Sequence, residues 1–409
     1  MKKMFIKVNT KEIFFVIVKK KKIYNININK MSFKSVNNIY LCSLKKISHS
    51  LEAIFVDYGG KKLGLLPFKN ISKKLFSNIK INFFLLDKNY FIKNKKKILI
   101  QILKLEKKNK GGLLTTFITL LGVYVILIIN KPHIRKISNK IQGEKRKKLK
   151  FLIKLLKIPK NMGIILRTSA SGKLIQELQK DCTIQIKKWN LICKNRKNIL
   201  LLKSLQIDNI FINLLREIIC YKISQIIIDN NIFFIRIKSF LILFNLLDYL
   251  NKIKLFKKNI SIFHYYNLQN KISAIFDQKI KLSSNISLYI DFTEALTVID
   301  INSSSLKNFN TLENTAFNIN FFIIPEIIRQ IRLKDIGGII IIDFISMRKK
   351  INKKIVEKNF KFHAKKEFSR IIIGKISKFG LLEISRRKIY NLSYIVKKKI
   401  IKELFLFRK

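Results

Sequence analysis

Cysteine, tryptophan, proline and acidic residues are all scarce in this chain of 409 residues, which contains 4 Cys, 1 Trp, 4 Pro and 24 Asp plus Glu. The cysteines, Cys42, Cys182, Cys193 and Cys220, are scattered and form no CxxC pair. Their spacing argues against a cysteine zinc site and against the disulfide framework of a secreted protein. Reduced thiols in a cytosol are therefore the expectation.

The shortage of acid leaves a large excess of positive charge. Lys plus Arg number 84, and the formal net charge is +60. A surface of this kind attracts polyanions, and nucleic acid is the partner it favours. The chain is also dominated by Lys, Ile, Asn and Phe, the residues that A+T-rich codons specify. Compositional drift is thus a second explanation, and the charge alone leaves both open.

No targeting segment or membrane span is expected. Residues 1–18 alternate polar with apolar side chains and lack the continuous apolar stretch of a signal peptide. The uncharged segment 113–129 approaches membrane-spanning length. It contains three threonines and a glycine and is rich in β-branched residues, so it is predicted to form buried strands.

The hydrophobic pattern predicts a mixed α/β chain of several domains. Short apolar runs bounded by Lys, Asn or Gly predict strands at 13–18, 23–28, 39–43 and 53–58, with a hairpin turn at Asp57-Tyr-Gly-Gly60. More β structure is expected at 116–129, 162–168 and 225–237. Apolar residues at helical spacing predict helices over 138–156 and 171–190.

The last third predicts a crossover unit. Residues 286–291 and 296–301 are typical of paired strands, and an apolar stripe from Ile324 to Ile331 predicts a helix with Pro325 in its first turn. Gly337-Gly338 interrupts the chain before a buried strand that ends at Asp343. Strand, helix and strand in this order place Asp300 and Asp343 near the carboxyl ends of neighbouring strands.

These two aspartates are the candidate site. Asp300 and Asp343 each interrupt a strongly apolar run, where a carboxylate must be paired, hydrogen-bonded or bound to a metal ion. Oxygen ligands facing a phosphate-binding surface suit Mg²⁺. Asn302 lies one strand repeat from Asp300 and faces the same side. The alternative is that both aspartates only cap turns or helices.

The ordered motifs of the chain resemble those of the ribonuclease E/G family. The resemblance in the last third rests on Asp291-Phe-Thr-Glu-Ala-Leu-Thr-Val-Ile-Asp-Ile-Asn-Ser303, 312–320, 329–338, 342–345 and Phe379-Gly-Leu-Leu-Glu-Ile-Ser-Arg386. Upstream, 50–59 and 64–67 are similar to the OB-fold motifs of the family, and 110–117 and 163–168 to its 5′-end sensor region. The resemblance spans essentially the whole chain.

The resemblance implies a modular fold. It implies an RNase H-like part made of 1–35 and 212–276, an OB-fold RNA-binding domain at 36–116, a 5′-sensor region at 117–211 and a DNase I-like catalytic domain at 277–409. It implies Mg²⁺ as cofactor, bound by Asp300 and Asp343 beside Asn302. It also places cations near the active site, namely Lys104, Lys110 and Arg370.

Two further groups of residues take roles from the resemblance. Phe55 and Tyr58 would contact RNA bases, although Phe55 could equally be a core ring and Tyr58 a turn residue. A 5′-monophosphate would be bound by Gly122, Ile126, Arg167 and Thr168. The second stacking aromatic of the OB-fold is Leu65 here, which would weaken the hold of that surface on RNA. The CxxC zinc-link of the family is missing, so a homodimer or higher oligomer would have to form without that link.

The implied function is a Mg²⁺-dependent endoribonuclease that cleaves single-stranded A/U-rich RNA to leave a 5′-phosphate and a 3′-hydroxyl. Messenger RNA decay and the processing of ribosomal and transfer RNA are the expected tasks. The expected location is the cytoplasm of a bacterial endosymbiont, with a plastid stroma as the alternative. The rival functions are an RNA-binding protein of the same family with decayed catalysis and a basic membrane-surface protein.

Overall fold

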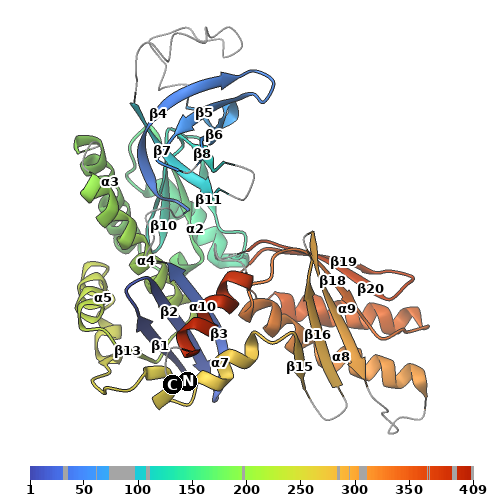
Figure 1. Ribbon diagram of the computed structural model, residues 1–409. Helices are drawn as coiled ribbons and strands as arrows, with labels where there is room; N and C mark the ends of the chain where they lie inside the picture. The colour runs from blue at the N-terminus through green and yellow to red at the C-terminus, as the bar shows by residue number, and fades with distance from the viewer. Residues whose placement is uncertain are drawn as a thin grey trace. The chain divides into compact units, whose positions relative to one another are not determined.

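A computed structural model describes residues 1–30, 36–60, 62–72, 97–106, 111–195, 199–282, 286–293, 295–303, 311–365, 367, 369–388 and 394–406. The chain divides into two compact units (Figure 1). One contains residues 1–30, 225–230 and 254–409, and the other contains 31–224 and 231–253. Each unit combines sheets with helices, which confirms the mixed α/β class. The finer domain boundaries remain a prediction.

A closed five-stranded barrel lies in the second unit and is consistent with the expected OB-fold. Its strands are β4 (Ile39–Ser48), β5 (Ala53–Asp57), β6 (Gly64–Pro67), β7 (Lys97–Lys104) and β8 (Leu113–Thr115), followed after β6 by the short helix η1 (Phe68–Asn70). Val56, Leu66 and Ile100 are fully buried inside it. The predicted turn joins β5 to β6, where Gly59 adopts a φ of +76° and its N–H donates to Asp57 Oδ1.

A four-stranded sheet completes the β structure of the second unit. It orders β11 (Arg135–Ile137), β12 (Met162–Leu166), β10 (Val125–Ile129) and β9 (Thr119–Leu121). The helices of this unit are α2 (Gly143–Leu155), η3 (Thr168–Ala170), α3 (Ile175–Lys194), α4 (Ile199–Tyr221), α5 (Asn231–Leu243) and η4 (Leu247–Lys252). Segment 113–129 forms strands as predicted. Among the described residues no helix combines the length and apolarity that a bilayer crossing requires.

The first unit begins with a five-stranded sheet in the order β14 (Ile253–Leu255), β13 (Gln225–Ile228), β1 (Lys2–Val8), β2 (Glu12–Lys19) and β3 (Lys22–Lys30). Its core includes buried side chains of α6 (Ile262–Tyr265), α7 (Gln269–Ile275) and α10 (Tyr394–Leu406). The predicted strand over 225–237 is wrong after Ile228, because α5 starts at Asn231. The segment is so rich in Ile and Phe that its period is ambiguous.

A six-stranded sheet carries the candidate site. Its order is β15 (Lys279–Lys281), β16 (Ile286–Phe292), β17 (Leu296–Ser303), β18 (Gly338–Asp343), β20 (Leu381–Arg386) and β19 (Ile371–Ile376). Helices α8 (Leu312–Leu333) and α9 (Lys350–Ala364) run along it (Figure 1). Their apolar residues form one core with Ile299, Ile340 and Leu382. The sheet is thus covered by these helices on one face, and we call the other its open face.

The sequence predicts Pro325 in the first turn of a helix, and this prediction is wrong. Pro325 lies in the interior of α8. A proline there removes one N–H donor and leaves the carbonyl four residues earlier without its helical partner. That carbonyl belongs to Phe321, and it accepts a hydrogen bond of 3.0 Å from Asn359 Nδ2 of α9. The contact between the two helices therefore compensates the lost backbone bond, and the helix continues.

A buried ion cluster ties α10 to the end of the six-stranded sheet. Asp335, just after α8, accepts from Arg386 Nη1 at 2.9 Å and lies 3.9 Å from Lys397 Nζ of α10. Glu367 pairs with Arg332 at 2.6 Å and lies 3.6 Å from Arg386. Charges removed from water in this way depend on one another, because the loss of one leaves another uncompensated.

We predict that Asp335→Ala lowers the free energy of unfolding of the chain by about 3–5 kcal/mol, because it removes a carboxylate that compensates the buried charges of Arg386 and Lys397. The matched control is Glu403→Ala, which breaks the exposed pair with Lys399 and should cost at most about 1 kcal/mol. Urea denaturation followed by circular dichroism measures both. Equal small effects of the two substitutions would contradict the prediction.

Candidate active site

Side chains along β17 and β18 alternate between the covered face of the sheet, which is the core, and the open face, which carries the candidate site. Ile299 and Ile342 are fully buried, whereas Asp300 is half-buried and Asp343 is exposed. Successive strand residues point to opposite faces. Because the isoleucines pack against α8 and α9, both aspartates project from the open face. Asn302, also exposed, lies on that face two residues beyond Asp300.

The register of the two strands sets the aspartates side by side. Strands β17 and β18 pair in parallel, and Asp300 is the direct partner of Asp343. Residues so paired are about one strand spacing apart, ~4.8 Å. Partial burial raises the pKa of Asp343, and the negative charge of Asp300 raises it further. The predicted meeting of the two carboxylates at neighbouring strand ends is therefore confirmed.

The donor set fits a small hard cation. Two carboxylates and the amide of Asn302 offer oxygen ligands on one open surface, which suits Mg²⁺ because it keeps several waters and takes one or two protein carboxylates. Within the described part of the chain no group of three or more His, Cys, Asp or Glu side chains is arranged so that it could hold a metal ion. Asp291 and Glu383 also lie on the open face. They pair with Val298 and Ile341, which precede Asp300 and Asp343 by two residues on β17 and β18.

Arg370 does not join this cluster. It precedes β19, whose first residue Ile371 pairs with Arg386, and Arg386 pairs in turn with Gly338 at the start of β18. Asp343 lies five residues further along β18, which is ~17 Å at the usual rise per residue. The register therefore places Arg370 at the opposite end of the strands, because β18 and β19 run in the same direction.

The barrel presents Phe55 differently from Tyr58. Phe55 is half-buried on β5, between Leu65 of β6 and the exposed Lys46 of β4, so part of its ring faces solvent. Tyr58 is only 6% exposed, and its hydroxyl donates to Glu106 at 3.3 Å. Burial, helped by Glu106, raises the pKa of Tyr58 to about 12. Tyr58 therefore belongs to the core of the barrel and offers no open ring face.

The two lysines predicted near the active site belong to the same unit as the barrel. Lys104 is exposed at the end of β7. Lys110 lies outside the described residues.

Arg167, the central residue of the predicted 5′-phosphate site, is largely internal. It is 8% exposed, and its Nη1 donates to the carbonyl of Gly122. Burial, with a contribution from the charge of Arg216, lowers the pKa of Arg167 to about 9. Thr168 and Ile126 are half-buried. In this arrangement Arg167 holds the backbone at Gly122 and does not present its guanidinium to solvent.

Sequence reasoning missed Asp181, which lies beside these residues. Its carboxylate is fully buried and accepts from the N–H groups of Tyr124 and Val125 at 2.7 and 3.0 Å. A Cβ built on Gly122 would come within 2.3 Å of it, so the glycine permits this close approach. Burial raises the pKa of Asp181 to about 6. The signal was available, because Leu178, Asp181 and Gln185 share one helical stripe.

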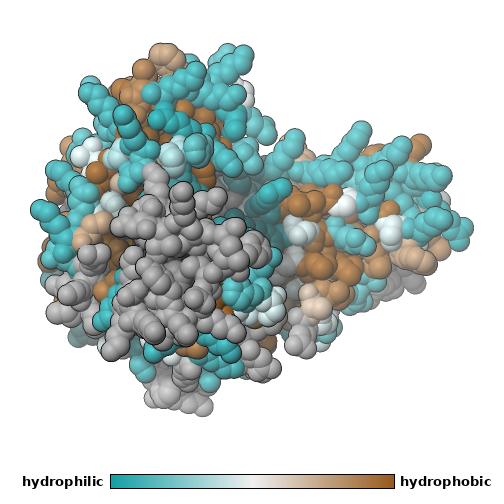
Figure 2. Space-filling model, turned by 90° about the horizontal axis from the view of Figure 1, so that it is seen from above, coloured by the Kyte–Doolittle hydropathy of each residue, from teal (hydrophilic) through white to brown (hydrophobic). Residues whose placement is uncertain are grey.

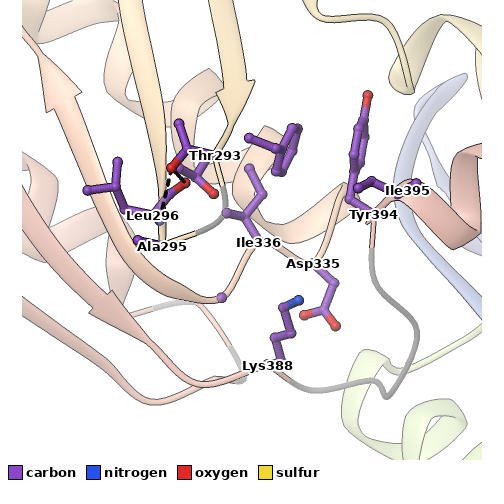
Figure 3. A pocket seen from close by; sticks show the side chains of 11 residues that line it. Thr293, Ala295, Leu296, Asp335, Ile336, Lys388, Tyr394 and Ile395 are labelled. Atoms are coloured by element: carbon purple, nitrogen blue, oxygen red, sulfur yellow. Dashed lines mark hydrogen bonds between the residues drawn. The ribbon is translucent and has the colours of Figure 1, made fainter. Parts of the chain in front are cut away.

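A cavity of about 190 Å³ lies at the other end of the six-stranded sheet. Figure 3 shows Tyr394 of α10 on one side of it and Thr293 and Leu296 of the β16–β17 turn on the other. Thr293 Oγ1 donates to the carbonyl of Leu296 at 2.8 Å. Since Leu296 begins β17 and Asp300 lies towards its end, this cavity is separate from the aspartate pair.

The pairing of the carboxylates generates a test that needs no metal ion. We predict that Asp300→Asn lowers the pKa of Asp343, because it removes the neighbouring negative charge. A ¹³C NMR titration of the aspartate carboxyl groups measures the shift, and Asp291→Asn on the same face serves as control. An unchanged titration midpoint of Asp343 in Asp300→Asn would show that the two groups do not face each other.

Comparison with known proteins gives a consistent answer over most of the chain. A profile of the Ribonuclease E/G family matches residues 119–389. The chain is 39% identical over 395 residues to ribonuclease E of Buchnera aphidicola subsp. Schizaphis graminum and 35% identical over 403 residues to ribonuclease E of Escherichia coli, in each case over 95% of its length. Ribonuclease G of Salmonella typhimurium is 26% identical over 358 residues, 86% of the chain.

The chain spans only 40% and 37% of the length of those two ribonuclease E relatives, and 73% of the ribonuclease G relative. The matched profile includes Asp300, Asn302 and Asp343, and so covers the whole open-face cluster. The similarity therefore reaches the residues that sequence and geometry had already singled out. The chain belongs to the Ribonuclease E/G family.

Proposed function

We propose that this protein is a Mg²⁺-dependent endoribonuclease acting on single-stranded RNA. The single observation that carries the proposal is the direct cross-strand pairing of Asp300 with Asp343 on the open face of the sheet. Membership of the family supports the reaction class. The net charge of +60 supports a polyanionic substrate.

The proposed chemistry divides roles among named residues. Asp300 and Asp343 would supply carboxylate oxygens to the metal ion, and Asn302 would orient a ligand or the attacking water. A Mg²⁺ ion bound there would stabilise the charge that develops on the scissile phosphate. The products would carry a 5′-phosphate and a 3′-hydroxyl. Since burial and the charge of Asp300 raise the pKa of Asp343, metal binding should strengthen as the pH rises through the pKa of Asp343.

The family also suggests finer assignments of the domains and of the biological task, which we include in the proposal. The barrel would bind RNA as an OB-fold, and the two sheets of the first unit would be RNase H-like and DNase I-like parts. A/U-rich substrates, messenger RNA decay and the processing of ribosomal and transfer RNA follow from the family, as does action in a bacterial cytoplasm as a homodimer or larger oligomer. In the 5′-phosphate sensor, Arg167 would act by holding Gly122, with Thr168 and backbone donors nearer the phosphate.

Catalysis is tested directly. Asp300→Asn and Asp343→Asn should each reduce Mg²⁺-dependent cleavage of a short 5′-phosphorylated RNA to background, while RNA affinity stays nearly unchanged because phosphate affinity resides in the basic surface. Gel-based cleavage and fluorescence anisotropy measure the two properties. Asp291→Asn, one row back on the same face, is the control and should cleave normally. Full activity of either site variant would refute the metal assignment.

The barrel makes its own contribution to RNA affinity in this proposal. Figure 2 shows many hydrophilic side chains among the described residues of one face, together with several hydrophobic areas. Phe55→Ala should weaken binding of single-stranded RNA by about 1–3 kcal/mol, the usual contribution of one stacked base. Phe151→Ala, which removes an exposed ring of α2, is the matched control and should have no effect. Equal affinities of the two variants would remove Phe55 from the interface.

A further inference from the structure

A tyrosine stands beside the aspartate pair on the open face. Tyr289 of β16 is the direct cross-strand partner of Asp300, on the side away from Asp343. It is also paired with Lys279 of the edge strand β15. A single row of side chains therefore crosses four strands in the order Lys279, Tyr289, Asp300 and Asp343, so that a cation, a ring and two carboxylates follow one another.

The dimensions of this row suit one extended nucleotide chain. At ~4.8 Å per strand, the row is ~14 Å long, and the ring of Tyr289 originates ~5 Å from Asp300. Lys279 is exposed at one end of the row, and Lys281 is exposed on the same strand two residues on. A strand of RNA with its scissile phosphate at the aspartates would thus bring the adjoining base over the ring and a further phosphate towards the lysines.

The exposure of Tyr289 indicates a role outside the core. Its neighbours Leu288 and Ile290 are fully buried and pack towards α8 and α9, whereas Tyr289 is 39% exposed on the opposite face. A ring placed there adds little to the core. It presents a π-face next to carboxylates that must stay hydrated or bound to a metal ion.

The chemistry of the row favours a nucleotide as the occupant. An apolar protein surface laid over Tyr289 would also bury Asp300 and Asp343 without partners, which is costly. A nucleotide would avoid this cost, because its phosphate would approach a cation held by Asp300 and Asp343 while its base stacked on the ring. Stacking requires an unpaired base, so the same contact would favour single strands.

We propose that Tyr289 is a positioning residue that stacks on the base adjoining the scissile phosphodiester, with Lys279 contacting a neighbouring phosphate. This inference rests on the proposed endoribonuclease function. It adds a second base-stacking ring to the one proposed for the barrel, and it lies in the same row as the catalytic carboxylates. The base is selected by its π-face, so the contact recognises single-stranded RNA without reading one particular base.

The test uses the full chain and a short single-stranded RNA whose cleavage site has been mapped. The fluorescent adenine analogue 2-aminopurine is placed in turn at the two nucleotides flanking the scissile bond, and its emission is read with Asp343→Asn, which holds the RNA without cutting it. Adding the protein should quench one of the two positions. Tyr289→Ala in that background should abolish the quenching, and Tyr289→Phe should retain it.

Kinetics in the otherwise unmodified chain separate stacking from a structural role. Tyr289→Ala and Tyr289→Leu should each lower kcat/KM by roughly 5- to 150-fold, the loss expected for one stacked base. Tyr289→Phe should restore it, because only a ring can stack. Phe322→Ala, which removes an exposed ring from α8 on the helical side of the sheet, is the matched control and should cleave normally.

Lys279→Ala supplies an independent readout. It should weaken RNA binding and reduce the slope of log affinity against log salt by about one. Rescue by Tyr289→Leu, or the absence of quenching at both flanking positions, would overturn the stacking role even if the chain cleaves RNA. Failure of the unmodified chain to cleave any RNA would instead overturn the proposed function, and it would be seen first, when the cleavage site is mapped.

Discussion

The parallel register of β17 with β18 is the constraint on which the candidate site depends. It is fixed by the crossover through α8, whose apolar stripe covers only one face of the sheet. Ile299 and Ile342 are buried against that helix. Because successive residues of a strand point to opposite faces, Asp300 and Asp343 must then lie on the open face. A slip of one residue in either strand would bury one carboxylate, so packing energy on the covered face sets the geometry of the open face.

Much of the fold and the centre of the site could be predicted from the sequence, because they depend on local patterns. Apolar runs that end in Asp, with Gly337-Gly338 before the second run, were enough to place Asp300 beside Asp343. Helix α9 was not anticipated, since its many lysines hide the buried stripe of Val356, Phe360 and Ala364. For α5 the opposite holds, because apolar residues surround the helix and obscure its period.

Other features depend on long-range pairing that no local pattern reveals. Arg370 falls at the far end of the strands because β19 pairs with β20, and neither strand alone indicates that register. Pro325 is tolerated inside α8 because Asn359, on another helix, donates to the freed carbonyl. The placement of Tyr289 in the row with the aspartates likewise follows only from pairing, since its own strand shows nothing more than an alternating pattern.

Arginine and lysine carry the same charge but differ in the hydrogen bonds that they can donate within this fold. A guanidinium carries several donors in a fixed plane, whereas an ammonium group is a flexible point charge. Arg146 donates to three backbone carbonyls, and Arg386 bridges Asp335 and the carbonyl of Ile336. Arg167 similarly holds Gly122. In these three examples the arginine lies at a buried or half-buried position where its donors find acceptors within the fold. Lysine occurs at both kinds of position, since Lys397 is fully buried beside Asp335 whereas Lys104 and Lys279 are exposed.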